Sequence, residues 1–139
     1  MMVLDTNVVS EVMRAQPEPA VLSWLDQQEP AGLWLSAVVA AELMAGVARL
    51  PEGKRRQQLA LVVATMLEQD FAGRVLAFDL AAASVYAELV ARREQMGRPI
   101  AMADAQIAAT CVANNATLVT RNQKDFANLG LTTFDPWVT

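Results

Sequence analysis

Val3-Leu4-Asp5-Thr6-Asn7 is the stretch that decides the fold of this chain. Two apolar residues typical of a buried strand are followed at once by a carboxylate and by two small polar residues that favour the start of a helix. In an open α/β sheet, ligands collect at the carboxyl ends of the strands. An aspartate at the end of a first strand therefore directs attention to acids further along the chain, and the sequence offers Glu42, Asp104 and Asp125.

Strand-like and helix-like segments alternate along the sequence. Short apolar runs between turn residues predict strands, and apolar residues spaced three and four apart predict helices. The predicted strands are 2–4, 33–35, 75–78, 117–119 and 132–134, and the predicted helices are 6–14, 17–28 or 19–28, 37–50, 54–70, 80–96, 104–115 and 123–129. This alternation predicts one α/β domain, residues 1–139, with a parallel sheet of four to five strands covered by helices on both faces.

Composition narrows the function. A net charge of −4 and a pI near 4.7 argue against a protein that holds nucleic acid by a general basic surface. The absence of histidine removes the commonest general base, the histidine-based triads and most zinc sites. Cys111 is the only cysteine, which favours a reducing cytoplasm over a disulfide framework, and no apolar run reaches the ~18 residues that span a bilayer. The 54% hydrophobic content predicts that some apolar surface is buried against a partner.

Two carboxylates occupy positions with both a structural and a functional interpretation. Asp5 could simply cap the helix that follows it, because aspartate is favoured there. Glu42 is more unusual, since its helical neighbours three and four residues away are all small or apolar and cannot pair with it. A carboxylate on such a helix is costly to bury unless it is paired, protonated or bound to a metal. The other reading places Glu42 at a solvent-facing helix edge, and the spacing alone does not show that it reaches the end of the sheet.

The remaining candidates follow the same logic. Asp104 lies in the first turn of an alanine-rich helix, where the helix dipole alone favours a negative charge. Asp125 lies in a short polar segment, where a surface position is the simplest interpretation. Thr120 and Asn122 follow the fourth predicted strand and could form hydrogen bonds at the sheet edge that carries Asp5.

Together these acids point to a bound cation. Three carboxylates within ~4 Å of one another would repel by ~4 kcal/mol per pair at an effective dielectric constant of ~20. All-oxygen ligands without histidine or paired cysteines favour Mg²⁺ or Mn²⁺ over zinc.

Four blocks of sequence carry a family resemblance. They are LDTNVVSE at 4–11, LSAVVAAELMAGVARL at 35–50, AMADAQIAATC at 101–111 and TLVTRNQKDF at 117–126. In this order and spacing they resemble the PIN-domain family, specifically the VapC-type toxins of type II toxin–antitoxin systems and their FitB-like branch. The resemblance covers essentially the whole chain, and the four blocks together are far more specific than LDTNV alone.

The resemblance implies a three-layer α/β/α fold and a metal-dependent endoribonuclease whose acidic pocket binds Mg²⁺ or Mn²⁺. By this similarity, Asp5, Glu42 and Asp104 are the three core acidic positions. The fourth family position, often an aspartate, falls at Asn122, with Asp125 close behind. Asn122 could still orient a water, and Asp125 could supply the missing charge. The resemblance also implies a homodimer silenced by a small antitoxin with a DNA-binding domain.

The residues support a hypothesis of RNA phosphodiester hydrolysis without a side-chain nucleophile. One or two ions held by Asp5 and Asp104, with help from Glu42, would activate a water and stabilise the leaving oxygen. Further candidates hold these ligands in place or contact phosphate: Thr6, Asn7, Thr120, Arg121, Lys124, Arg98 and the run 54–56.

Two other classes remain open. A non-catalytic PIN-like module that binds proteins would suit the apolar excess and Trp24, Trp34 and Trp137. A flavodoxin-like receiver domain also carries acids at its strand ends, although the four blocks do not fit that pattern. A ribonuclease assay with Mg²⁺, run beside phosphate-donor labelling, separates the three.

Overall fold

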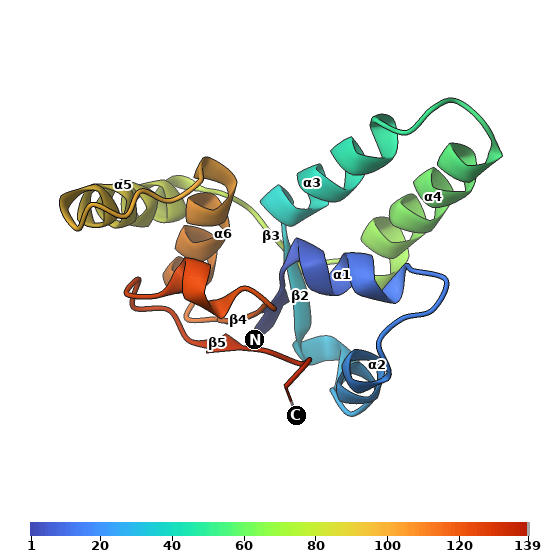
Figure 1. Ribbon diagram of the computed structural model, residues 1–139, viewed down its shortest axis with the longest axis horizontal. Helices are drawn as coiled ribbons and strands as arrows, with labels where there is room; N and C mark the ends of the chain where they lie inside the picture. The colour runs from blue at the N-terminus through green and yellow to red at the C-terminus, as the bar shows by residue number, and fades with distance from the viewer. Residues whose placement is uncertain (139) are drawn as a thin grey trace.

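A five-stranded parallel sheet forms the centre of the computed structural model, which describes residues 1–138 (Figure 1). The strands lie in the order β3-β2-β1-β4-β5, so β1 is central and the chain adds strands on both sides of it. Their bounds are β1 Met2–Leu4, β2 Leu33–Ser36, β3 Val75–Leu76, β4 Thr117–Val119 and β5 Thr133–Phe134. All four pairings are parallel, which confirms the predicted α/β class and sheet.

The helices form layers on either side of this sheet. Their bounds are α1 Thr6–Val12, α2 Pro19–Asp26, α3 Ala37–Ala48, α4 Lys54–Thr65, α5 Leu80–Gln95 and α6 Met102–Ala113. The chain adds β2 and β3 on one side of β1, and then β4 and β5 on the other side. Because crossover connections are right-handed, the connections made in these two directions cover opposite faces of the sheet. Accordingly α1 to α4 lie on one side of the sheet and α5 and α6 on the other (Figure 1), which is the expected three-layer arrangement.

The strands are buried because both faces of the sheet are covered. Val3, Leu35 and Leu118 have no exposed surface and form the middle of the core. Trp24, Trp34 and Trp137, which the non-catalytic alternative would use, are partly buried against this core, and Trp24 stacks on Phe134 with ring centroids 5.1 Å apart. Within residues 1–138, no helix combines the length and the apolar character that crossing a membrane requires.

Three helices begin directly where a strand or extended segment ends, each with a polar cap. The side chains of Asp5, Ser36 and Asp79 accept hydrogen bonds from backbone N–H groups of α1, α3 and α5. Each of these caps satisfies a backbone N–H group that the first turn of its helix leaves without an intrahelical partner. Because the strands are parallel, the Asp5 and Ser36 caps lie at the same edge of the sheet.

Some helix limits differ from the prediction. Helix α4 ends at Thr65 and continues as a π-helical turn, η2 Met66–Asp70, and α6 begins at Met102, two residues before Asp104. The predicted helix 123–129 is only a 3₁₀ turn, η3 Gln123–Phe126; a second such turn, η1 Pro30–Gly32, precedes β2. η3 stops because Ala127 is extended and Asn128 and Gly130 have φ angles of 65° and 67°, outside the right-handed helical region.

Candidate metal-binding active site

Asp5 lies at the end of β1, and its side chain is held from three directions. Oδ1 accepts a hydrogen bond from the backbone N–H of Thr6 at 2.9 Å. Oδ2 accepts from Thr120 Oγ1 at 2.8 Å and from Asn7 Nδ2 at 3.3 Å. The Asp5 residue is only 5% exposed to solvent. It therefore caps α1, and it also lies at the sheet edge where the sequence predicts the site.

Burial dominates the electrostatics of Asp5. Its pKa is raised above the ordinary aspartate value, chiefly because burial disfavours the charged form. The three hydrogen bonds lower the pKa and the negative charge of Glu42 raises it, but neither effect outweighs burial. Structural aspartate caps are normally solvated, so a cap with this burial is unusual.

Thr120 joins the ends of the two central strands β1 and β4. Its buried hydroxyl donates to Asp5 and accepts from Asn7 Nδ2 at 3.2 Å and from the backbone N–H of Asn122 at 3.1 Å. The Arg121 backbone N–H in turn donates to Asn7 Oδ1 at 3.3 Å. This network fixes the chain after β4 against the beginning of α1.

Glu42 reaches the same edge, which spacing alone could not establish. Its Oε1 accepts a hydrogen bond from Thr6 Oγ1 at 2.5 Å, a short distance typical of a bond to a charged acceptor. Thr6 is bonded to Asp5 through its backbone and to Glu42 through its side chain. One residue thus connects the β1 end with α3.

Asp104 completes the acidic group from the opposite layer. It lies in the first turn of α6 and is partly buried. Burial is the largest cause raising the pKa of this carboxyl to about 6, and the negative charges of Asp5, Glu42 and Asp125 raise it further. Asp104 is therefore within electrostatic reach of carboxylates on three other segments.

The donor set fits a hard divalent cation bound largely through water. Within residues 1–138, no three His, Cys, Asp or Glu side chains are close enough to ligate one ion together. Mg²⁺ usually keeps several waters and binds to only one or two carboxylates, so direct contact with all three acids is not required. Asp5 and Asp104 would hold such an ion, with Glu42 acting through water.

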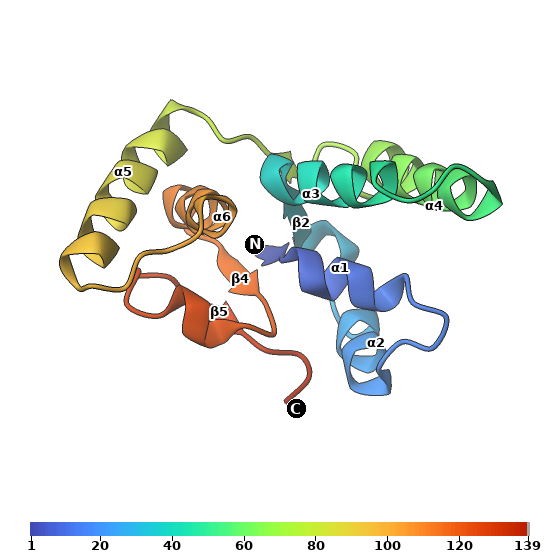
Figure 2. The ribbon, with the colours of Figure 1, turned by 45° about the horizontal axis from the view of Figure 1, so that its top comes forward.

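The other predicted candidates lie at different distances from this group. Arg121 is exposed, and its guanidinium lies 5.0 Å from the centre of the Trp137 ring. Asn122, Lys124 and Asp125 are exposed on and around η3. The basic run 54–56 begins α4, at the end of the α3–α4 hairpin far from the sheet (Figures 1 and 2), so the fold does not bring it to the acids.

Two charged residues that the sequence reading did not select are buried. Glu11 accepts hydrogen bonds from Arg14 and from the Glu18 backbone N–H, and the latter is the main reason that its pKa is lowered. Arg93 has three backbone carbonyls as partners. The burial of Arg93 could have been predicted from the sequence, because Arg93 falls four residues after Leu89 on the buried face of α5.

Comparison with known proteins agrees with this architecture. The family model of the PIN domain matches residues 2–130, so the chain belongs to the PIN-domain family. It is 44% identical over 137 residues to "VapC ribonuclease Y4jK" of Sinorhizobium fredii, covering 99% of this chain and 98% of that one. It is 39% identical over 137 residues to "Toxin FitB" of Neisseria gonorrhoeae, covering 99% of both.

The fold of the chain also matches that of a solved relative. The crystal structure of FitAcB from Neisseria gonorrhoeae matches with a TM-score of 0.94 and 39% identity over all of both chains. Within the PIN-domain family, the chain therefore groups with the VapC-type and FitB-like proteins, as the four sequence blocks predicted.

Proposed function

We propose that this protein is a Mg²⁺- or Mn²⁺-dependent endoribonuclease toxin that a cognate antitoxin neutralises. The observation that carries the proposal is the group of acids at the carboxyl edge of the sheet. Buried Asp5 shares this edge with Glu42 and with Asp104, whose pKa is raised to about 6 by burial and by its acidic neighbours. The relative named VapC ribonuclease supports this reaction class, and the relative named Toxin FitB supports the toxin role.

The side chains would share the work as follows. Asp5 and Asp104 would hold the cation. The Glu42 carboxylate, which Thr6 holds by a hydrogen bond, would accept a hydrogen bond from a water and so orient it. When bound, the ion supplies Lewis-acid stabilisation of the phosphate and lowers the pKa of the attacking water. Thr120 and Asn7 would keep the Asp5 carboxylate in one orientation. Arg121, exposed beside this network, would attract the RNA phosphates.

A cleavage assay tests this assignment. The purified chain should cut RNA with Mg²⁺ or Mn²⁺ and stop when the metal is chelated. Asp5→Asn and Asp104→Asn should lower the rate by more than about 100-fold, beyond the usual effect of losing a ligand's outer partner. Asn also caps helices, so Asp5→Asn keeps that structural role.

The matched control is Glu88→Gln, an exposed carboxylate on α5. It should cut RNA at the wild-type rate. Undiminished cleavage by either site variant would refute the assignment. An inactive wild-type chain that still binds a partner protein would favour the non-catalytic alternative.

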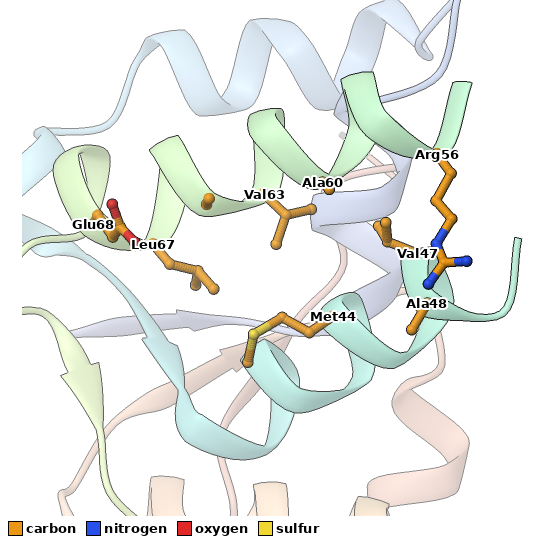
Figure 3. Close-up of a pocket in the computed structure, with 9 residues that line it drawn as sticks. Met44, Val47, Ala48, Arg56, Ala60, Val63, Leu67 and Glu68 are labelled. Carbon is orange, nitrogen blue, oxygen red and sulfur yellow. The ribbon is translucent and has the colours of Figure 1, made fainter. Parts of the chain in front are cut away.

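The antitoxin part of the proposal has a candidate surface. An apolar groove of about 370 Å³ runs between α3 and α4 (Figure 3). Glu68 lies at its end nearer the sheet and Arg56 at the end nearer the α3–α4 loop. Its apolar lining includes Met44, which is 51% exposed. The remaining apolar residues of the lining are Val47, Ala48, Ala60, Val63, Ala64 and Leu67.

An amphipathic antitoxin helix fits this groove, with basic residues toward Glu68 and acidic ones toward Arg56. Helix α3 lines the groove and also carries Glu42, so an antitoxin bound in the groove would contact a helix that forms part of the proposed site. Met44→Glu should weaken binding of the proposed antitoxin, with RNA cleavage unchanged. Met96→Glu, at an exposed methionine outside the groove, is the control. Equal antitoxin affinities of both variants would exclude the groove.

A further inference from the structure

Arg93 is a buried cation whose side-chain hydrogen bonds all run to backbone carbonyls within the described residues 1–138. It lies in the last turn of α5 and is only 5% exposed. The ion pair within 4 Å among residues 1–138 joins Arg14 and Glu11 instead. Burying a guanidinium without an opposite charge is costly, so its other contacts must offset this cost.

Those contacts connect two segments that carry acids of the proposed site. Arg93 Nε donates to the carbonyl of Arg98 at 2.8 Å, in the loop that leads to α6 and Asp104. Its Nη1 donates to the carbonyls of Asp125 and Ala127, both at 3.2 Å. Asp125 belongs to η3, which follows β4. One planar group therefore fixes the start of α6 and the loop after β4 relative to each other.

The two acids carried by these segments face a common space. A cavity of about 240 Å³ is lined by Arg93, Asp104 and Asp125, together with the loop residues 99–101. Asn122, at the position where the family often has an acid, is exposed and does not line this cavity. Its backbone N–H is bonded to Thr120, at the start of the turn. On this loop, Asp125 is the acid placed beside Asp104.

We propose that Arg93 is a positioning residue that holds the η3 loop against the α6 segment, so that Asp125 supplies the fourth acidic group in place of Asn122. This inference rests on the proposed metal-dependent function of the site. Arg93 acts through geometry: its guanidinium presents several donors in one plane and reaches three carbonyls at once, which a lysine ammonium on a single flexible stem does not reproduce.

Metal affinity of the full-length chain, measured by calorimetric titration with Mn²⁺, tests the inference independently of catalysis. Asp125→Asn should weaken Mn²⁺ binding by about tenfold, the lower range for loss of a supporting ligand group. Arg93→Lys, which keeps the positive charge, should weaken it to a similar extent. Arg92→Lys changes an exposed arginine of the same helical turn and should bind like wild type.

A double-mutant cycle separates positioning from general loss of structure. If Arg93 acts through Asp125, adding Arg93→Lys to Asp125→Asn should weaken Mn²⁺ binding by less than about twofold more, because coupled residues are not additive. Additive losses would overturn the inference. It would also be overturned if Asn122→Ala weakened binding as much as Asp125→Asn, or if Asp125→Asn bound like wild type.

Failure of the underlying function has a different signature. If the wild-type chain neither binds Mn²⁺ nor cuts RNA, both proposals are wrong. If wild type binds Mn²⁺, Asp104→Asn does not, and Asp125→Asn binds normally, then the site stands and only the role of Arg93 and Asp125 is wrong.

Discussion

Removing the charge of Asp104 should inactivate the protein and stabilise it at the same time. In the metal-free chain, burial and the charges of Asp5, Glu42 and Asp125 raise the pKa of Asp104 from 3.8 to about 6. The folded state therefore binds this proton more tightly than the unfolded state. The stability that results is fully present below about pH 4, and it is lost as the pH rises through about 6. Asp104→Asn has no such loss.

The size of the effect follows from the shift. One pKa unit corresponds to ~1.4 kcal/mol, so a shift of roughly two units gives about 3 kcal/mol before screening. Asp104 is only partly buried, and solvent screening reduces this to about 1–1.5 kcal/mol. The helix dipole favours the charge in the first turn by about 0.5 kcal/mol, but the raised pKa shows that burial and repulsion outweigh it. For a chain of this size, the gain corresponds to roughly 3–6 °C in the thermal midpoint.

Thermal melting with a chelator present, from pH 4 to pH 8, measures this effect. Asp104→Asn should melt with wild type at pH 4 and several degrees above it at pH 8. Glu88→Gln, at an exposed site on α5, should follow wild type at every pH. An Asp104→Asn protein that melts at or below wild type at pH 8 would refute the claim that the acids repel one another in the folded state.

Three further outcomes are expected. Mg²⁺ should raise the melting midpoint of wild type at pH 8 by binding preferentially to the folded state, and it should leave Asp104→Asn almost unchanged; equal shifts in both would place the ion elsewhere. Thr6→Val removes the 2.5 Å hydrogen bond to Glu42 and should lower RNA cleavage about tenfold, whereas Thr6→Ser should retain it; equal rates for both variants would show that this bond is dispensable. Burial raises the pKa of Cys111 to about 12, so a thiol reagent at pH 8 should label it only after unfolding, and rapid labelling of the native chain would contradict the packing of α6.

The sheet and the helix caps could be predicted from the sequence because their signals are local. Short apolar runs followed by Asp5 or Ser36 define a strand end and a helix start within a few residues. The helix predicted over 123–129 was too long because its apolar spacing continues to Leu129. The backbone already leaves the helical region at Ala127, and spacing carries no information on φ.

The site was only partly predictable because its contacts join distant segments. Glu42 was recognised as unusual, but its bond to Thr6 spans 36 residues and depends on how α3 packs beside α1. Arg93 was missed because an arginine in a last helical turn normally serves the dipole and points to solvent. Its three carbonyl partners become neighbours only when the loops after α5 and β4 meet.

Asp5 shows most directly that the site is maintained at a cost to stability. Three donors surround its carboxylate, and such bonds alone would lower the pKa, yet burial and the charge of Glu42 leave it raised. An asparagine at this position could cap α1 equally well without a buried charge. Capping therefore explains a polar residue at the end of β1 but not the choice of a carboxylate. The proposed cation would offset this cost, because a bound positive charge favours the charged form of both Asp5 and Asp104. The same repulsion that destabilises the metal-free chain would then favour binding of the proposed ion.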